Sequence, residues 1–341
     1  MTAAQQPAAP EPAWDSVRPA RGSQVALVIF GFLFAIPSTV FTVLRIWQPS
    51  GQSVALLTSF ISYAIIGHLV ALLFFLIALI RARKRLLLAV ITILVAIMLA
   101  LHGSWLGPLF VPDGRPATTS EFRVLSVNVL GGAADARRLD EAAGDADLVV
   151  LLEFEPDAME ELDRLGWSER FPHQVGADER GVNGSAVFSR FPLSDSELLP
   201  QTTFQQWMAT AEVPEVGPVR VIGVHPCNPY CGMSRFQSEH RLIRRIAAEQ
   251  PADQPLIVAG DFNAVDDHRA MQELRSDGLR SATDVAGAGW QPTFPAGRRF
   301  PALIPIDHVL INDRLTATQV GTVAIPGTDH LGILATLAGT S

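Results

Sequence analysis

Lysine is almost missing from this sequence of 341 residues: the only one is Lys84, although the chain has 26 basic and 34 acidic residues. From position 115 onward there are 19 arginines, no lysine and 31 acidic residues, a net charge of −12. A lysine Schiff base is therefore excluded there, and acid–base chemistry must come from carboxylates and histidine. The negative charge also argues against strong non-specific nucleic-acid binding, which needs an electropositive surface.

Charge of either sign is scarce between Gln24 and about Phe110. Three apolar runs occupy this stretch, at 24–44, 54–80 and 86–106. Each is long enough to cross the hydrocarbon core of a bilayer, which takes roughly 20 residues. A cleaved signal peptide has a single apolar region of only about 7–15 residues, and core helices of a soluble protein would show a polar face. The sequence therefore predicts three transmembrane helices, with the lipid bilayer as a partner.

Basic residues at the ends of these runs indicate their orientation. Arg18 and Arg21 precede the first run, and positions 81–85 hold four positive charges between the second and third. The loop after the first run has only Arg45 at its edge. Because cytoplasmic loops are enriched in Lys and Arg, we expect a multi-pass plasma-membrane protein with a cytoplasmic N-terminus. Three crossings then place the C-terminal domain outside the cytoplasm.

Composition divides the chain into four parts. Positions 1–22 are rich in Ala, Pro and Gln and are expected to form a disordered cytoplasmic tail. The transmembrane region spans 23–106, and 107–121, with its Pro, Gly, Ser and Thr, is typical of a linker. A soluble domain follows at 122–341. Within the membrane region, His68 is expected to be a neutral, hydrogen-bonded side chain of a small bundle.

Short β-type runs alternate with helical patterns in the soluble domain. The predicted strands are 122–127, 148–152, 185–189, 208–213, 219–224, 256–259, 306–311 and 331–335, and the predicted helices are 135–143, 156–165, 233–249 and 269–277. Several strands are continuous Val/Ile/Leu runs, as expected for strands buried on both faces. The alternation favours an α/β fold, and adjacent strands without an intervening helix indicate mixed sheets.

Polar residues follow the ends of these predicted strands. They are Asn128, Glu153, His225, Asp261 with Asn263, Asp307 with His308, and Asp329 with His330. Each alone has an ordinary explanation, because Asp and Asn are common in turns. Six strand ends that supply only Asn, Glu, Asp and His indicate chemistry on a rigid scaffold. Mg²⁺ prefers oxygen ligands, a carboxylate can deprotonate water, and the charge on a phosphate needs a metal or a cationic His.

In this order the motifs resemble those of the endonuclease/exonuclease/phosphatase superfamily, which includes deoxyribonuclease I and neutral sphingomyelinases. The most specific are Gly-Asp-Phe-Asn at 260–263 after an apolar strand and Asp329-His330 before the last one. The resemblance extends over about 122–337. It implies a four-layer α/β sandwich, with two central mixed sheets flanked by helices, preceded here by the three transmembrane helices.

The resemblance also implies a metal site. Glu153 would be the principal ligand of Mg²⁺ or Mn²⁺, Asn128 would be its neighbour in the metal shell, and Asp329 would lie close to the ion.

Catalytic roles are implied for five further residues. Asp261 would orient or deprotonate the attacking water, and Asn263 would position it or hold a phosphate oxygen. His330, polarised by Asp307, would face the phosphate, and His225 would also contact it. The superfamily resemblance leaves open how the base and acid roles divide between Asp261 and His330.

Cysteine is also scarce: Cys227 and Cys231 are the only two, and they lie in one Pro-containing loop after His225. In a domain outside the cytoplasm this favours a disulfide that rigidifies the rim of the site, provided that the Cα atoms come within about 7 Å. Free thiols are the next alternative. A metal site shared with His225 is the third, although zinc normally takes a fourth ligand, which is not identifiable here.

Other residues could line the substrate entrance. Arg235 lies near the start of a predicted helix and could reach a substrate phosphate, whereas the later arginines 241, 244 and 245 are expected to form a solvated face. Trp290, Phe294 and Phe300 flank a Pro-rich loop and could equally be packing aromatics.

The sequence thus predicts a membrane-anchored, divalent-metal-dependent phosphoesterase, and more specifically a phosphodiesterase, acting outside the cytoplasm. Its substrate would be a lipid-linked phosphate, with extracellular nucleic acid as the alternative. A catalytically silent binding module on the same fold is the rival from another class. No protein partner is evident, and scarce lysine with abundant arginine and alanine suggests a GC-rich bacterial genome.

Overall fold

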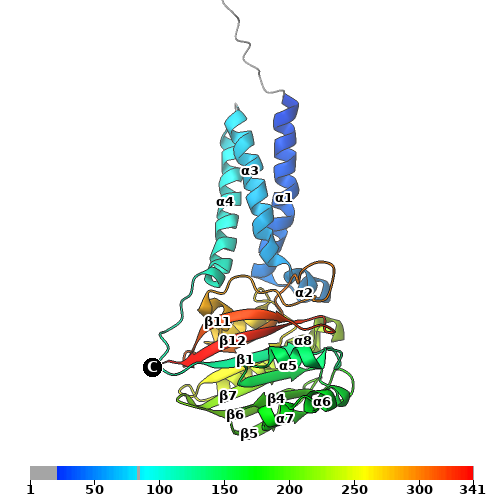
Figure 1. Cartoon of the computed structure of the whole chain (residues 1–341). Helices are drawn as coiled ribbons and strands as arrows, with labels where there is room; N and C mark the ends of the chain where they lie inside the picture. The colour runs from blue at the N-terminus through cyan, green and yellow to red at the C-terminus, as the bar shows by residue number, and fades with distance from the viewer. Residues whose placement is uncertain (1–20, 83–84, 341) are drawn as a thin grey trace, which may run out of the picture.

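The computed structural model describes residues 21–82 and 85–340. It contains a helical bundle attached to an α/β domain, whose strands run across the direction of the bundle (Figure 1). The predicted tail lies outside the described residues up to position 20, and the first helix begins at Arg21. Arg83 and Lys84 of the basic loop also lie outside the described residues.

Three helices form the bundle: α1 (Arg21–Trp47), α3 (Ala64–Arg81) and α4 (Leu86–Leu106). The segments Gly22–Trp47, Ile61–Arg81 and Leu86–Phe110 are long and apolar enough to cross a membrane. Helix α3 packs closely against α1 at Gly67, where a Cβ atom would lie 2.0 Å from Ser38 Oγ. Small residues at such contacts allow helices to approach in a bilayer. His68 and His102 each lie within hydrogen-bond distance of the Thr42 hydroxyl, at 3.1 and 2.9 Å.

The second apolar run, expected at 54–80, is not one continuous helix. It divides into α2 (Gln52–Thr58), the 3-10 turn η1 (Ile61–Tyr63) and α3. The first two elements contact the α/β domain: the Ala55 carbonyl bonds His268 Nε2 at 2.9 Å, and the Tyr63 hydroxyl donates to the Leu303 carbonyl at 2.6 Å. The chain thus contacts the α/β domain at α2 and η1 and then continues into α3.

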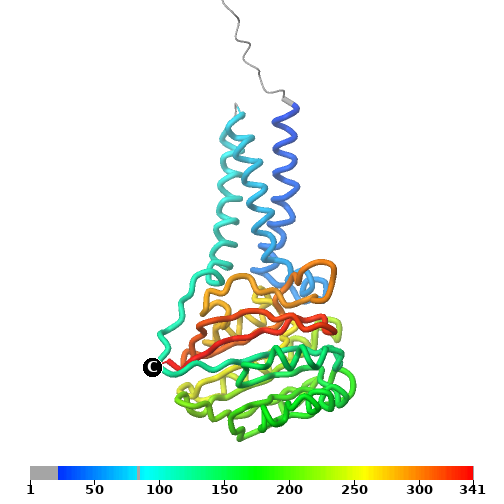
Figure 2. The backbone as a smooth tube through the Cα atoms, viewed as in Figure 1, coloured from blue at the N-terminus to red at the C-terminus, as the bar shows by residue number. Residues whose placement is uncertain are grey.

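A connecting segment joins the bundle to the domain. The 3-10 helix η2 (Gly107–Phe110) continues α4, and the chain then runs along the domain to the side where the C-terminus lies (Figure 2). Thr118 N donates to the Gly339 carbonyl at 2.9 Å before the first strand starts. The predicted linker 107–121 thus follows the surface of the domain for part of its length.

Two six-stranded sheets form the centre of the domain. The first has the order β11 (Leu315–Ala324), β12 (Leu331–Gly339), β1 (Phe122–Asn128), β2 (Leu148–Leu152), β4 (Ser185–Ser189) and β3 (His173–Ala177). The second has the order β5 (Leu193–Leu198), β6 (Trp207–Val213), β7 (Gly217–Val224), β8 (Leu256–Asp261), β10 (Asp307–Ile311) and β9 (Arg280–Ser281). The pairs β1/β2 and β7/β8 are parallel and the others antiparallel, so both sheets are mixed, as predicted.

Alternate residues of the central strands belong to different hydrophobic cores, one on each face of the sheet. Val124 and Val150 pack between the two sheets, together with residues of the second sheet such as Val221. Their neighbours Leu125 and Val149 face outward. The outer face of the first sheet is covered by α5 (Ala136–Ala142), α6 (Pro156–Asp163) and α7 (Trp167–Arg170), and that of the second by α8 (Met233–Glu249) and α9 (Arg269–Ser276). The predicted four-layer sandwich is confirmed.

The strand ends that carry the predicted site meet at one end of the sandwich. Strands β1, β2, β7 and β8 finish there, while β10 and β12 begin there, because each of these two runs antiparallel to a neighbour. Asp307 is directly opposite Asp261 in the β10/β8 register. Gly260, with φ 153°, lets β8 come close to β7, since a Cβ atom would lie 1.9 Å from the Val224 carbonyl oxygen. Topology therefore brings the polar residues together.

Candidate active site

Asn128 connects two carboxylates at the centre of the site. Its Nδ2 donates to Glu153 Oε1 at 2.9 Å and to Asp261 Oδ2 at 3.1 Å, and its Oδ1 accepts from Leu130 N at 3.0 Å. The amide is buried and comes from the end of β1, so it lies beside the strands that carry both acids. Asn128 therefore fixes the orientation of Glu153 and Asp261 relative to each other.

Two of the residues at the strand ends adopt left-handed backbone conformations. Glu153 has φ 54° and Asn263 has φ 51°. For a side chain such as Glu this conformation costs on the order of 1–3 kcal/mol, and such strain clusters at functional sites. Asn263 is further held by its amide N, which donates to Asp261 Oδ1 at 2.8 Å, and by its Nδ2, which donates to the Pro226 carbonyl at 3.0 Å. Asn263 is thus positioned both by a local bond within its turn and by a bond to the loop after β7.

His330 and Asp307 form a buried pair. His330 Nδ1 lies 2.9 Å from Asp307 Oδ2, which leaves Nε2 facing Asp261 Oδ2 at 3.7 Å and Asp329 Oδ1 at 3.9 Å. Although burial opposes protonation, the carboxylates of Asp307 and Asp261 raise the pKa of His330 to about 10. The imidazole is therefore cationic at neutral pH, with one N–H directed at the other acids.

His225 faces two of the same acids. Its Nε2 is 3.7 Å from Glu153 Oε1 and 3.7 Å from Asp261 Oδ2, and its ring stacks on Phe204 with centroids 4.6 Å apart. Burial lowers the pKa of His225 to about 4, against the opposing effect of Asp261. The two histidines of the site therefore differ in charge at neutral pH.

The site has more acid than its own side chains balance. Burial raises the pKa of Glu153 and that of Asp261, which means that their ionised forms lack sufficient compensation. Within the described part of the chain, Glu153 Oε2, Asp307 Oδ1 and Asp329 Oδ1 are buried without a hydrogen-bond partner. Asp261, Asp307 and His330 also offer ligand atoms within 4.8 Å of one another. Unpartnered carboxylate oxygens of this kind fit a hard divalent cation.

A sequence model of the Endonuclease/Exonuclease/phosphatase family matches residues 125–330, more than half of the chain and all of the clustered residues. The chain belongs to this family. Family members hydrolyse phosphoesters and generally use divalent metals, so the protein is a phosphoester hydrolase. No curated protein matches the sequence.

Solved structures of the family share the fold at low sequence identity. Humanised TDP2 from D. rerio has a TM-score of 0.53 and 17% identity, over 64% of this chain and 98% of its own. A family member from Bacteroides vulgatus has a TM-score of 0.53 and 17% identity, over 65% and 100%. A family member from Beutenbergia cavernae has a TM-score of 0.50 and 20% identity, over 65% of this chain and 72% of its own. At such identities the likeness concerns the fold alone.

The rim of this family fold carries the two cysteines. Cys227 and Cys231 are bonded in the structure, with Cα atoms 6.1 Å apart. Glu239 of α8, a buried acid, holds the loop by accepting from Cys227 N at 2.9 Å. Arg235, at the start of the same helix, is exposed and bonds Thr203 Oγ1 at 3.3 Å, so it lies at the rim and not among the clustered acids.

The aromatic residues of the Pro-rich loop have three different environments. Phe294 packs against the His330 ring, with centroids 5.0 Å apart. Trp290 packs edge-on against Tyr63 of the membrane region at 6.0 Å. Phe300 is half exposed, at 50%. One loop thus contacts both His330 and Tyr63, which lies at the start of the second candidate membrane span.

Several residues that support the site were not singled out from the sequence. Thr293 Oγ1 accepts from the Ile306 and Asp307 amides at 3.1 and 3.2 Å. Thr328 Oγ1 donates to the Asn128 carbonyl at 2.7 Å and accepts from His330 N at 3.1 Å. Both threonines are buried, but a lone Thr in a loop gives no signal. Glu239 could have been found from the sequence, because it is an acid on the apolar face of a predicted helix.

The loop after β8 links the site to the bundle. It follows Asp261, the last residue of β8, contains Asn263 and ends with Asp267 and His268. Asp267 Oδ1 accepts from Arg45 Nε at 2.5 Å, and its Oδ2 accepts from the Ser62 hydroxyl at 2.7 Å. The membrane segment therefore contacts the far end of the loop that positions the catalytic candidates.

Proposed function

We propose that this protein is a membrane-anchored, divalent-metal-dependent phosphodiesterase in which an activated water attacks the phosphorus in line with the leaving group. The observation that carries the proposal is the buried cluster in which Asn128 joins Glu153 to Asp261 and His330 Nε2 faces Asp261 and Asp329. Such a cluster supplies a base, a phosphate-binding cation and free carboxylate oxygens within one site.

The metal would be held by Glu153, through its unpartnered Oε2, with Asp329 beside it and Asn128 orienting the carboxylate. When bound, Mg²⁺ or Mn²⁺ polarises the phosphoryl oxygens and lowers the pKa of a coordinated water. The oxygen-rich donor set favours these ions over softer ones.

The remaining groups have roles that follow from their partners. Asp261 accepts the proton of the attacking water, since its Oδ1 is oriented by Asn263 N and its Oδ2 faces both histidines. His330 donates from Nε2 to a phosphate oxygen or to the leaving group, while Asp307 fixes its Nδ1. His225 and Asn263 bind the phosphate from the other side, and Arg235 contributes at the rim.

The proximity of the membrane segment supports a lipid-linked phosphate as the substrate. Tyr63 bonds the loop that carries Phe294, and Phe294 packs on His330. The acidic composition of the domain is less suited to extended nucleic acid, which is the alternative substrate because the family includes endonucleases. On the positive-inside rule, we place the domain outside the cytoplasm at the plasma membrane.

The test uses full-length protein in lipid nanodiscs with four substrates: bis-p-nitrophenyl phosphate, p-nitrophenyl phosphate, plasmid DNA and sphingomyelin. Each is assayed with Mg²⁺, Mn²⁺ or EDTA, beside Asp261→Ala, His330→Ala and the exposed control Glu212→Gln. We expect metal-dependent diester hydrolysis that is lost in the two site variants and kept in the control.

The substrate preference then separates the alternatives. Faster turnover of sphingomyelin supports the lipid proposal, whereas hydrolysis of plasmid DNA alone contradicts it in favour of a nuclease. A folded, metal-binding protein that turns over none of the four contradicts the phosphodiesterase proposal and favours the silent module.

A further inference from the structure

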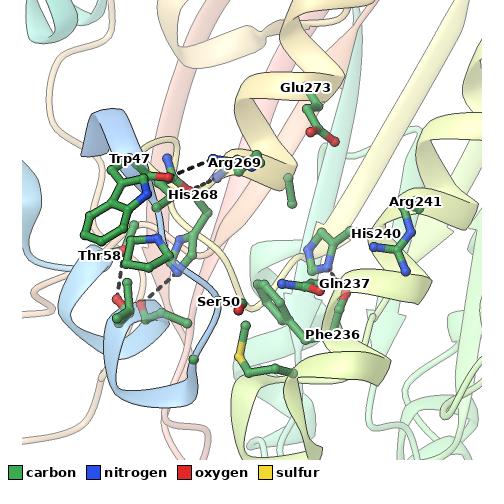
Figure 3. Close-up of a pocket in the computed structure, with 17 residues that line it drawn as sticks. Trp47, Ser50, Thr58, Phe236, Gln237, His240, Arg241, His268, Arg269 and Glu273 are labelled. Atoms are coloured by element: carbon green, nitrogen blue, oxygen red, sulfur yellow. Dashed lines mark hydrogen bonds between the residues drawn. The ribbon is translucent and has the colours of Figure 1, made fainter. Parts of the chain in front are cut away.

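A cavity of about 610 Å³ lies between the membrane segment and the outer helices of the catalytic domain. One wall is formed by the end of α1, the following turn and α2; the other is formed by α8 and α9 (Figure 3). None of the predicted site residues lines it, as far as residues 21–82 and 85–340 are concerned. Its size lies in the range of about 300–1,000 Å³ that is usual for ligand sites.

The cavity adjoins the end of α1, the first helix that is long and apolar enough to cross a membrane. Trp47, the last residue of α1, lines it and is 68% exposed, and Trp is enriched at membrane–water interfaces. Arg269 Nη2 donates to the Trp47 carbonyl at 2.9 Å, and the Arg269 amide donates to Gln48 Oε1 at 2.5 Å. These bonds hold the α/β domain against the end of α1. With α1 spanning the membrane, as proposed above, the cavity lies next to the headgroups of the adjacent leaflet.

The polar groups on the α8 wall are free to bind an anion. Arg241 is exposed and has no hydrogen-bond or ion-pair partner among the described residues, although it was expected to belong to a solvated face. Gln237 lies one turn before it on the same face of α8 (Figure 3). Glu273, the acid on the wall, is already paired with Arg244 at 3.0 Å. A guanidinium without a partner beside a compensated acid favours an anionic ligand.

The remaining lining groups indicate an amphipathic ligand. The ring nitrogens of His240 and His268 are all occupied by backbone groups, at 2.7 to 3.3 Å, so they do not compete for the ligand. Met233, Phe236 and Val54 provide apolar surface next to Arg241. A free phosphate would use only the guanidinium, whereas a lipid would use both surfaces.

We propose that this cavity binds the headgroup phosphate of an anionic glycerophospholipid from the leaflet that faces the catalytic domain. Arg241 binds the phosphate through a charge-assisted pair, Gln237 bonds a headgroup oxygen, and the glycerol portion contacts the apolar wall. The site is separate from the catalytic cluster and does not depend on the reaction proposed for it.

Native mass spectrometry of the full-length protein in detergent tests this proposal, with phosphatidylglycerol and phosphatidylcholine added at equal concentrations. We expect tighter binding of phosphatidylglycerol, weakened about tenfold or more in Arg241→Gln, because a hydrogen-bonded charge contributes about 1.5–3 kcal/mol. The matched control is Arg245→Gln, on the same helix, whose side chain is exposed, lies 4.0 Å from Glu249 and does not line the cavity. It should bind phosphatidylglycerol like the wild type.

Three results would overturn the proposal. Equal binding of the two lipids by the wild type would mean that the cavity does not select anionic headgroups. Equal losses in Arg241→Gln and Arg245→Gln would assign the effect to overall surface charge. Displacement of the lipid by millimolar glycerol 3-phosphate or inorganic phosphate would show a site for free phosphate rather than for lipid.

Discussion

Two of the places where the protein buries carboxylates differ in the partners that these groups have. At the junction with the membrane segment, Asp267 is 5% exposed, and both its oxygens are bonded, one to Arg45 and one to Ser62. In the active site, Asp307 is 1% exposed and keeps one oxygen without a partner in the described structure, as does Glu153. Similar burial thus goes with complete pairing in one place and incomplete pairing in the other.

The difference separates a structural carboxylate from a functional one. A buried charge is costly unless it is paired and hydrogen-bonded. Where the chain supplies the cation itself, as Arg45 does, the pair holds two regions together. Where a carboxylate oxygen keeps no partner, as at Glu153 and Asp307, it remains available for a cation or proton from outside, which is what phosphate chemistry needs. The two places can be compared by making equally conservative changes in each.

The largest expected contrast is in catalysis. Asp261→Asn keeps the shape of the side chain but removes the base, so kcat on bis-p-nitrophenyl phosphate should fall about 10³-fold. Asp267→Asn, the same change at the junction, should keep kcat within about threefold of wild type. Steady-state kinetics on both variants, in nanodiscs, is the measurement. Equal losses would remove the distinction between the two acids.

Removing the cation at the junction should have a somewhat smaller effect in free energy, and on stability rather than on kcat. Arg45→Met leaves Asp267 buried and unpaired, which should lower the free energy of unfolding by about 3 kcal/mol. The double variant Arg45→Met/Asp267→Leu should recover most of this loss, because an apolar pair of similar volume often replaces a buried ion pair without cost. Denaturant unfolding measures the stability of both variants. An unchanged free energy of unfolding in Arg45→Met would contradict a stabilising pair.

Metal removal should affect only the active site. At 100 times its dissociation constant, Mg²⁺ should stabilise the wild type by about 2.7 kcal/mol, and EDTA should reverse this. Glu153→Gln should lose most of the gain, since it removes the expected principal ligand, whereas Asp267→Asn should retain it. Thermal unfolding with and without metal provides the comparison. If Mg²⁺ still stabilised Glu153→Gln, the metal site would have to be assigned to other residues of the cluster.

The smallest expected effect is a pH dependence at the junction. Burial lowers the pKa of His268 to about 4. Its neutral form is therefore favoured in the folded protein, so its contribution is complete above about pH 6.5 and is lost as the pH falls toward 4. Between pH 6.5 and 5 the loss should be roughly 2 kcal/mol.

The control for this effect is His268→Gln, which retains a donor for the Ala55 carbonyl but does not titrate. Its thermal midpoint should fall less than that of the wild type between pH 7 and pH 5. Parallel curves for the two proteins would assign the acid sensitivity to other groups.

Much of the clustering in the candidate site could be predicted because its residues stand at the ends of apolar strands. Asn128, Glu153, Asp261 and Asp307 each follow or begin a continuous buried run, so their positions are visible in the chain itself. Their spatial relation follows once the strands share two sheets. Residues such as Phe204 and Thr293 were not visible, because they come from loops with no local pattern and reach the site through tertiary packing.

The strands also divide into those that could be predicted from the sequence and those that could not. All eight predicted strands are present in the structure, and each of them is buried enough to be recognised from an apolar run. The four that were missed, β3, β5, β9 and β11, are the outer strands of the two sheets. An outer strand has a neighbour on one side only, and β5 exposes five of its six residues. Its sequence needs no apolar run, so its pairing depends on the sheet beside it.

Local sequence was therefore sufficient for the elements that are apolar on every side: the three helices that are long and apolar enough to cross a membrane and the central strands, and with them the fold and the order of the candidate site residues. The three-dimensional packing settled the rest. It split the second apolar run into α2 and α3, paired Arg45 with Asp267 across 222 positions, and left Glu153 Oε2 without a partner. Burial in lipid or between sheets imposes a pattern on neighbouring residues, whereas pairing between distant residues imposes none.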